Sequence, residues 1–439
     1  MEKNVSLERN EPKASEEENE KKNGNSATAE IKDIYEIIPK WRETDGPACL
    51  IIKAWMEPVD EIARFQPAGF PEVGHVIYDA PRKNGVEKVC IVDSPASMAN
   101  HLESVCLADL EGIELHPDLK GMPYLVCTTD RNYNVDNDGN IEANQNDPQD
   151  KVVVISLKEG HRIASDYFLD GKKKNSEKTF REELKDEFKI KSINNKTYFL
   201  HPEDWWNVIK TIFKYDPNSL IHGVLFPKMQ IKISRILTGH LEAIGASRVS
   251  RSGVKFDRLR KTVSRQPIFA VDEETAREII ATFTIDLAML RSFGKMDADN
   301  KDENDKKEST EPNAVYGLSE EQKKFLLELA LWKIKRILEK PYRFRTQCYL
   351  KTVKIEIKDE CGKILKENAD INSLVKIDIQ KYIKKCFGNN ENKTIIYYPV
   401  NDLFKHGKKE TATGENSDIE SNSANESEKE EEEEDSGEE

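Results

Sequence analysis

The 439-residue sequence predicts an α+β fold built on a mainly antiparallel sheet and decorated by insertions. Short runs rich in β-branched residues alternate along the chain with runs whose apolar residues recur at helical spacing, as in mixed folds. No glycine-rich nucleotide loop joins a predicted strand to a predicted helix. The doubly wound fold of nucleotide-binding proteins is therefore not expected.

The first half of the chain should contain three strands and a helix. Residues 49–56 and 86–92 are short runs rich in β-branched side chains, which favours strands. The run 95–107 is expected to be a helix, because the serine–proline pair at 94–95 suits a helix start. Residues 152–157 form the third predicted strand.

In the second half, residues 203–213 place their apolar side chains near one helical face. Residues 223–233 alternate like a strand towards their end, and 282–287 predict a strand that leads into a short helix. The clearest helix is 318–339, whose apolar residues lie on two sides and indicate burial. Residues 343–357 read as one long strand.

Four segments have too few apolar residues to form a core and are expected to be unstructured. The predicted organisation is a disordered tail at 1–30, one domain at 31–406 and an acidic disordered tail at 407–439. Within the domain, disordered insertions are expected near 132–150 and 295–312.

Charge is distributed unevenly along the chain, whose formal net charge is -14. The tail 407–439 carries 3 basic and 14 acidic residues, whereas residues 205–265 carry 12 Lys and Arg against 3 Asp and Glu. The acidity therefore lies in the predicted tails, and one folded stretch is strongly basic.

The sequence predicts a cytoplasmic protein with no membrane contact. It has no run of 18 apolar residues, and residues 1–30 lack the apolar centre of a secretory signal. Its seven cysteines form no CxxC pair, which indicates reduced and mostly buried thiols rather than a disulfide framework or a zinc site.

No convincing catalytic motif is present: GxxxxGK[ST], GxGxxG, GxSxG and HExxH are all absent. His222 follows Asp216 by six residues, a spacing that allows a general base or a metal ligand. The alternative is a turn stabilised by Asp216 and Asn218 beside a hydrogen-bonded histidine. We expect no cofactor, no metal and no enzymatic activity.

The basic stretch has features of a nucleic-acid surface. Its Lys and Arg residues are spread through predicted strands and turns, and Gly245, Ser252 and Gly253 between them allow close backbone approach to a phosphate. Phe213, Tyr215 and Phe256 are candidates for stacking on bases. This combination suits single-stranded RNA held without sequence readout, and an ordinary basic surface is the alternative.

Several strings resemble the signatures of one protein family. They are FQPAGFP at 65–71, DSPASMAN at 93–100 followed by Leu102 and Glu103, FKYDPNSLIHG at 213–223, SGVKFDR at 252–258, FTIDL at 283–287 and ALWKI at 330–334. In this set and order they are similar to the large RAMP-superfamily backbone protein of type I-G CRISPR systems, formerly type I-U. Ala68 and Phe256 depart from the family pattern, where Thr and Asn are usual.

The resemblance implies a modified RRM-like (ferredoxin-like) palm with an antiparallel sheet, a β-hairpin thumb and helical insertions. Copies of the protein would polymerise along a CRISPR guide RNA and present it for pairing with target DNA, so that specificity comes from base pairing. Further implied partners are a guide-processing and capping subunit, a large subunit and a recruited helicase–nuclease.

Charge and resemblance together predict the RNA-binding residues. They are Lys214, Tyr215, Asn218, His222, Arg235, Arg251, Ser252, Gly253, Lys255, Phe256 and Arg258. The strings also have structural interpretations: 65–71 as a tight turn, 94–102 as helix cap and core, and 213–223 as a structural loop.

Two other functions stay open. Related type III backbone subunits cut RNA with an aspartate in an exposed loop, and Asp257 would be that residue in a metal-dependent endoribonuclease. Alternatively, the basic stretch binds an acidic protein in a purely structural assembly.

Overall fold

In this computed structural model, the structure describes residues 33–70, 74–82, 85–108, 112–130, 133–135, 141–143, 151–193, 197–249, 254–255, 268–269, 273–296 and 315–403. The chain from Lys32 onward forms one compact unit. The predicted tails 1–30 and 407–439 lie outside the described residues, as do most positions of the two predicted insertions.

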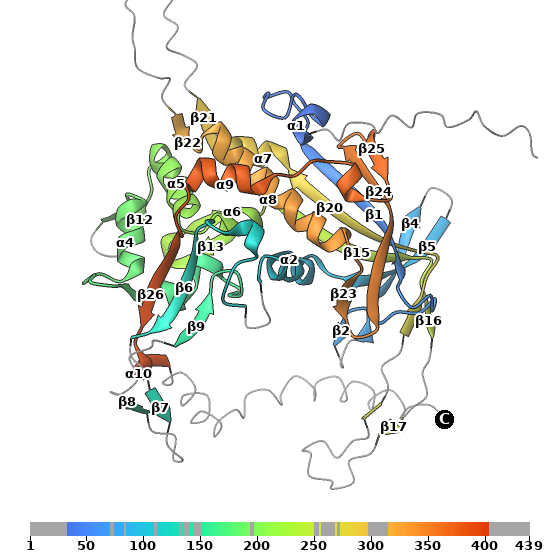
Figure 1. Ribbon diagram of the computed structural model, residues 1–439, viewed down its shortest axis with the longest axis horizontal. Coiled ribbons are helices and arrows are strands. Elements are labelled where there is room, and N and C mark those ends of the chain that lie inside the picture. The colour runs from blue at the N-terminus through green and yellow to red at the C-terminus, as the bar shows by residue number, and fades with distance from the viewer. Residues whose placement is uncertain are drawn as a thin grey trace, which may run out of the picture. The chain divides into compact units, whose positions relative to one another are not determined.

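An eight-stranded antiparallel sheet is the largest element of the fold (Figure 1). Its strands run in the order β23-β24-β1-β20-β15-β5-β4, and β25 also pairs with β24. Their bounds are β1 (Cys49–Pro58), β4 (Ile77–Arg82), β5 (Gly85–Asp93), β15 (Leu237–Ile244), β20 (Glu278–Asp286), β23 (Tyr342–Arg345), β24 (Cys348–Asp359) and β25 (Ile364–Asn368). The predicted α+β class with an antiparallel sheet is confirmed.

Alternating side chains give this sheet one buried face. In β1, Leu50 and Ile52 are buried, whereas Lys53 between Ile52 and Ala54 is half-buried on the other face. Ile52 pairs with Phe283 of β20, which is also buried. The strand period of two thus brings aliphatic and aromatic side chains from neighbouring strands into one core.

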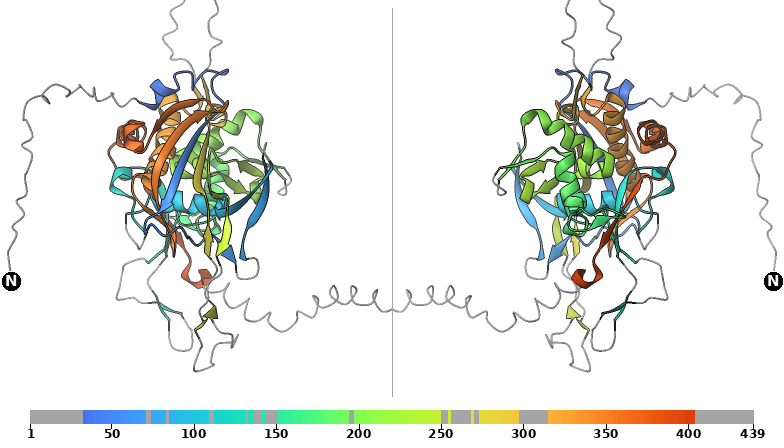
Figure 2. Two further views of the ribbon diagram at one scale, coloured as in Figure 1. Left: turned by 90° about the vertical axis from the view of Figure 1, so that its right-hand side faces the viewer. Right: turned by 90° about the vertical axis from the view of Figure 1, so that its left-hand side faces the viewer.

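The described residues form ten α-helices, and several of them pack against the central sheet (Figure 2). The longer ones are α2 (Pro95–Ser104), α4 (Phe180–Glu187), α5 (Trp205–Tyr215), α8 (Glu320–Leu338) and α9 (Ile379–Phe387). The shorter ones are α1 (Ile34–Ile37), α3 (Asp166–Leu169), α6 (Pro217–His222), α7 (Leu287–Ser292) and α10 (Val400–Leu403). Ser94 caps α2 and Ser319 forms a capping box on α8, so local sequence sets both helix starts.

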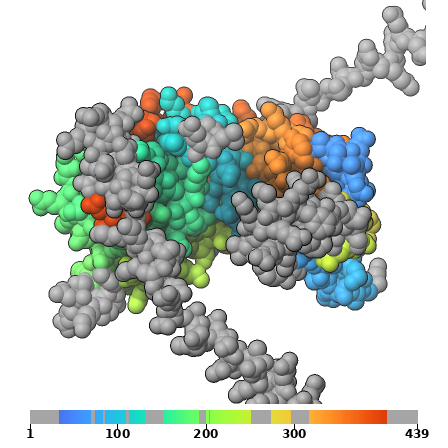
Figure 3. Space-filling view, turned by 90° about the horizontal axis from the view of Figure 1, so that it is seen from below, coloured from blue at the N-terminus to red at the C-terminus, as the bar shows by residue number. Residues whose placement is uncertain are grey.

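A second sheet brings distant parts of the chain together. It has the order β10-β26-β6-β9, with bounds β10 (Lys172–Lys173), β26 (Lys393–Tyr398), β6 (Tyr124–Thr129) and β9 (Val152–Ile155). The pair β26–β6 is parallel. In Figure 3, the green surface of the middle of the chain lies on the opposite side of the picture from the blue surface of the early strands.

Seven short two-stranded pairs complete the described strands. They are β2 (Gly69–Phe70) with β3 (Gly74–His75), β7 (Tyr133–Val135) with β8 (Ile141–Ala143), β11 (Lys191–Ile193) with β12 (Thr197–Phe199), β13 (Val224–Phe226) with β14 (Ile231–Ile233), β16 (Ser247–Val249) with β19 (Glu273–Thr275), β17 (Val254–Lys255) with β18 (Ile268–Phe269), and β21 (Gly294–Met296) with β22 (Val315–Gly317). The β7–β8 pair lies inside the segment 132–150 that was expected to be unstructured.

Two predicted strands are each divided by a turn. Residues 223–233 form a hairpin, because a 3₁₀ turn at Pro227–Met229 and a left-handed Gln230, with φ 55°, reverse the chain. Residues 343–357 contain β23 and β24, and Gln347, with φ 57°, lies in the turn between them. Positive φ at a residue other than glycine leaves little signal in a single sequence.

Within the part of the chain that the structure describes, no helix is long and apolar enough to cross a bilayer.

A carboxyl group on α8 is buried and has a raised pKa. Glu328 is 1% exposed, and its Oε2 accepts a hydrogen bond of 3.2 Å from the Asp378 backbone N–H. Burial, with a smaller contribution from the charge of Asp33, raises the pKa of Glu328 to about 7. The folded protein therefore holds a proton here that the unfolded chain releases near its ordinary value of 4.5.

We expect Glu328→Gln to become more stable than the wild type as the pH rises from 5 to 8. Because the pKa of Glu328 is higher in the folded than in the unfolded protein, the free energy of unfolding falls as the pH rises above the unfolded pKa. The decrease is complete above pH 7 and amounts to about 3 kcal/mol. Glutamine cannot ionise and keeps an oxygen for the Asp378 N–H. Urea unfolding at several pH values would measure the difference, and parallel stability profiles of the two proteins would contradict it.

Candidate nucleic-acid interface

The basic stretch leaves the central sheet as a hairpin whose root is well ordered. β16 pairs with β19, and Arg248 lies opposite Glu274. The 23 residues between these strands, 250–272, include Arg251, Lys255, Arg258, Arg260, Lys261 and Arg265. Inside this span the backbone of Lys255 belongs to β17, which pairs with β18.

A buried glutamate anchors this root. Glu274 is fully buried, and its Oε1 lies 3.1 Å from Nδ1 of His75 and accepts a 3.2 Å hydrogen bond from Nε of Arg248. The backbones of Phe65 and Glu274 exchange two hydrogen bonds of 2.9 Å each. Because Phe65 begins the FQPAGFP string, this string holds the base of the basic hairpin in place, which supports its structural interpretation.

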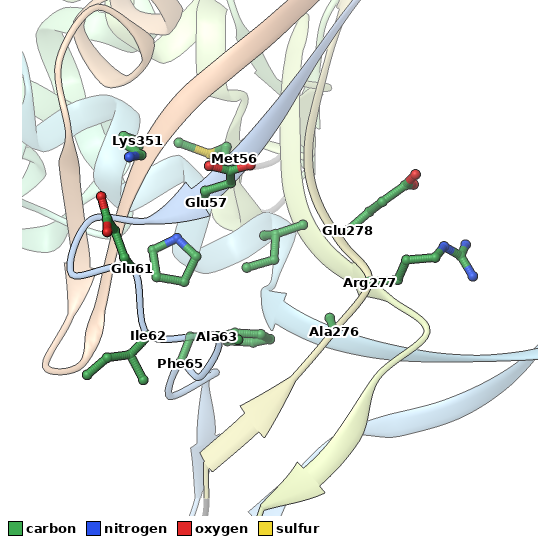
Figure 4. A pocket seen from close by; sticks show the side chains of 12 residues that line it. Met56, Glu57, Glu61, Ile62, Ala63, Phe65, Ala276, Arg277, Glu278 and Lys351 are labelled. Carbon is green, nitrogen blue, oxygen red and sulfur yellow. The ribbon is translucent and has the colours of Figure 1, made fainter.

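A pocket of about 370 Å³ lies beside the hairpin root (Figure 4). It is lined by the end of β1, by the segment around Ile62 and by the residues that follow β19. Its charged lining residues have both signs, namely Glu57, Glu61, Arg277, Glu278 and Lys351. Three carboxylates at this rim oppose the binding of a phosphate chain, so the pocket is a poor candidate for the interface.

A second polar cluster lies inside the core and connects α8, α6 and α2. Lys333 is fully buried and donates to Oδ1 of Asn218, and its Nζ lies 2.9 Å from Nε2 of His222. Asn218 Nδ2 donates to Oε1 of Glu103 at 2.7 Å. Arg162 donates to both oxygens of Glu103, at 2.7 Å each. One carboxylate thus serves two cations, one directly and one through Asn218.

The backbone of Arg162 is itself unusual. Its φ of 52° lies in the left-handed region, where a residue with a β-carbon is strained. Two charge-assisted hydrogen bonds to Glu103 hold the guanidinium in place, and Nη1 also approaches the carbonyl oxygen of Gly223 at 3.4 Å. The surrounding contacts therefore maintain this conformation.

The start of α6 adds a buried carboxyl group to the cluster. Asp216 is fully buried, and its Oδ2 accepts a 2.7 Å hydrogen bond from Ser219 Oγ. Burial raises the pKa of Asp216 to about 6. The sequence left two interpretations of 213–223 open, and the burial of Asp216, Asn218 and Ser219 supports the structural one.

Several predicted RNA contacts lie in the core or on the surface away from the hairpin. Tyr215 is 5% exposed, packs edge-on against Phe180 and donates its hydroxyl proton to Glu187 at 2.6 Å. Asn218 is fully buried. Neither side chain presents a surface to a base. Lys214 is exposed and pairs with Glu187 at 3.0 Å.

His222 and Arg235 do come together. Both line a hollow of about 420 Å³ between the β13–β14 hairpin and the 3₁₀ turn Arg162–Ala164. Arg162 and Lys232 line the same hollow. Arg162 and Lys232 were not predicted, and neither were Glu103 and Lys333. A charged residue inside an otherwise apolar helical run, as in ALWKI, is the signal that would have identified Lys333.

Five of the predicted residues lie outside the described part of the chain. They are Arg251, Ser252, Gly253, Phe256 and Arg258, and Asp257 of the nuclease alternative lies there too. Of Lys255 the structure describes only the backbone pairing with Ile268. RNA contact by this set stays a prediction.

The described residues give His222 a clear hydrogen-bonding role. An ammonium group has only donors, so Nε2 of His222 accepts the proton of Lys333, and this lone pair is not free to act as a base. Burial, with the charges of Lys333 and Arg162, lowers the pKa of His222 well below its ordinary value. No group of three or more His, Cys, Asp or Glu is placed to hold a metal within the described ranges.

All seven cysteines are free thiols, and four of them are buried. The prediction of mostly buried, unpaired thiols is confirmed.

Glu103→Gln should lower the free energy of unfolding by about 3–5 kcal/mol, because Arg162 and Lys333 would stay buried without their shared countercharge. Urea unfolding would measure the loss. Asp186→Asn is the matched control, since Asp186 forms an exposed 2.6 Å pair with Lys178 and exposed pairs contribute little. Equal unfolding midpoints for the two variants would contradict the proposed role of Glu103.

Glu274→Gln should loosen the hairpin root without unfolding the protein. Amide hydrogen exchange in Ser247–Val249 and Glu273–Thr275 should quicken about tenfold, because the charged acceptor of Arg248 is removed. The nearby exposed Glu278→Gln is the control. Unchanged exchange in both strands would show that the root is held by the backbone bonds to Phe65 alone.

The comparisons with known proteins agree with the resemblance in part. A family model described as CRISPR-associated protein GSU0053 matches residues 50–248, a little under half of the chain. No curated protein sequence matches. The crystal structure of Csc2 from Thermofilum pendens covers 79% of this chain and 77% of its own, at 9% identity and a TM-score of 0.22. A score this low does not indicate a shared arrangement of elements.

The matched part of the chain runs from β1 to β16 and includes Glu103, Arg162, Asn218 and His222. It therefore contains the buried polar cluster apart from Lys333. Over these residues the chain is similar to a CRISPR-associated protein family.

Proposed function

We propose that this protein is a guide-RNA-binding backbone subunit of a type I-G CRISPR effector complex. The match of residues 50–248 to a CRISPR-associated family supports the CRISPR assignment. Support for RNA binding comes from the hairpin loop 250–272, which has six Lys and Arg residues against two Asp and is mounted on a buried, hydrogen-bonded root. A basic loop on a rigid support suits contact with a phosphate backbone.

The antiparallel central sheet, with helices packed against it, supports a modified RRM-like palm, and the β16–β19 hairpin would be its thumb. Lys255 and Arg258 would contact RNA phosphates, and Phe256 would stack on a base. Further copies of the chain would line the guide in the same way. Target DNA would then be recognised by base pairing with the guide rather than by the protein.

In this proposal the protein is a cytoplasmic scaffold and carries out no chemistry. Its partners are a guide-processing and capping subunit, a large subunit, and a helicase–nuclease recruited after the target is bound. The tie between Lys333 and Nε2 of His222 supports a structural rather than a catalytic role for that imidazole.

Reversing charge in the hairpin should weaken RNA binding for every guide sequence. We expect Lys255→Glu, Arg258→Glu to bind single-stranded RNA at least about tenfold more weakly and to reduce the dependence of affinity on salt, because phosphate contacts release counterions. Fluorescence anisotropy with two unrelated RNAs at several salt concentrations would measure both effects. Lys358→Glu on the central sheet, far from the loop in sequence, is the control.

Two outcomes would overturn the proposal. Full-length protein co-expressed with its neighbouring subunits but purified without nucleic acid at low salt would favour a protein-binding role for the basic loop. Magnesium-dependent cleavage of complementary RNA that Asp257→Ala abolishes would make the protein an endoribonuclease.

A further inference from the structure

The hollow that contains His222 and Arg235 has an unusual lining. Its cationic side chains are Arg162, Lys232 and Arg235, and exposed His161 lies beside them. No Asp or Glu is among the residues that line it. Lys232 is exposed and Arg235 half-buried, and neither has a carboxylate within ion-pair distance among the described residues. Arg162, by contrast, forms an ion pair with Glu103, which is not among the residues that line the hollow.

His222 contributes a hydrogen-bond donor that lacks an acceptor. Because Nε2 accepts from Lys333, the proton of the neutral imidazole is on Nδ1. Nδ1 is buried, and none of the residues that the structure describes is a hydrogen-bond partner for it. The whole residue is 2% exposed. Leaving a buried N–H unpaired costs about 1–3 kcal/mol, so an acceptor oxygen that reaches Nδ1 is stabilised. Nδ1 is closed to solvent in the structure, so the imidazole must shift towards the hollow for this contact to form.

The shape of the hollow depends on Gly223. Its φ of 81° is a conformation that favours glycine, and a β-carbon there would lie 2.9 Å from the carbonyl oxygen of Ile233 and 3.0 Å from the backbone nitrogen of Arg235. The missing side chain lets the turn after α6 approach β14 closely. This approach places Arg235 beside His222.

The rim also has an apolar surface. Leu225 lines the hollow and is 53% exposed, although the neighbouring Val224 and Phe226 are buried. A free phosphate ion makes no use of such a side chain. A phosphate that belongs to a polynucleotide brings a ribose and a base, whose apolar faces can cover it.

We propose that this hollow binds a backbone phosphate of single-stranded RNA, with Arg235 and Lys232 contacting its oxygens, Nδ1 of His222 donating to one of them and the adjoining ribose against Leu225. This proposal rests on the proposed RNA-binding function and adds a second contact, separate in sequence from the hairpin loop. Because no Asp or Glu lines the hollow, an anion can bind there without repulsion from a carboxylate at its surface. The neutral imidazole of His222 supplies a hydrogen-bond donor for a phosphate oxygen.

The test uses full-length protein and a fluorescein-labelled single-stranded RNA. We expect Lys232→Gln, Arg235→Gln to bind about tenfold more weakly or worse, and the slope of log affinity against log salt to fall by about 0.7 for each phosphate that the variant no longer neutralises. Lys228→Gln, an exposed lysine in the turn of the same hairpin but outside the hollow, should bind like the wild type.

A second variant examines the imidazole. His222→Met keeps a weak acceptor, the thioether sulfur, for the Lys333 ammonium but has no hydrogen-bond donor, so it should bind RNA more weakly with an unchanged salt slope, because the charge of the protein stays the same. If this variant fails to fold, the Nδ1–H resonance of His222 in the wild type replaces it. That resonance should move downfield and exchange more slowly when RNA is added.

The outcomes separate this site from the general function. If wild-type protein binds RNA and the double variant binds equally well, the hollow is not a contact and the hairpin proposal survives. If no form binds RNA, the proposed function itself fails. If inorganic phosphate alone raises the melting temperature of the wild type but not of Arg235→Gln, while RNA affinity is unchanged, the site takes the free ion and the RNA assignment is wrong.

Discussion

A buried ammonium group organises the centre of this protein. Lys333 is the ninth of ten consecutive buried residues on α8, and an ion in such a place must be compensated. Asn218 and His222 accept its protons, and the charge of Glu103 reaches it through the Asn218 amide. Because these partners come from α6 and α2, the cluster connects the packing of the three helices. The strained turn at Arg162 closes the same cluster.

This cluster also gives a structural role to three strings that look like binding motifs. Glu103, Asn218 and Lys333 come from three separate strings, and all three side chains meet in the core. The FQPAGFP string has a comparable role, since Phe65 and His75 hold the Glu274 side of the hairpin root. A family-like sequence signature can therefore mark residues that support a surface rather than residues that form it.

The two candidate contacts with RNA are both carried by such supports. The loop 250–272 leaves from a root held by a buried glutamate, and the hollow beside β14 is formed against the buried cluster through His222. In each case, an arginine near the surface forms an ion pair with a buried carboxylate: Arg248 with Glu274, and Arg162 with Glu103. This arrangement fixes the direction of the cationic groups without neutralising those nearest the solvent.

The sequence by itself determined the fold class, the bounds of β1, β5, α2 and α8 to within a few residues, and the unequal distribution of charge. These features depend on local periodicity, helix caps and composition, which a chain carries at every position. Only the tertiary structure decided that residues 223–233 and 343–357 turn back on themselves, because a left-handed residue other than glycine leaves no clear pattern. It also decided that Tyr215 and Asn218 are buried, and that Arg235 lines the same hollow as Arg162 and Lys232. Burial and proximity of this kind depend on residues far away in the chain. A carboxylate that reaches a lysine through an asparagine over one hundred residues away from both has no local signature.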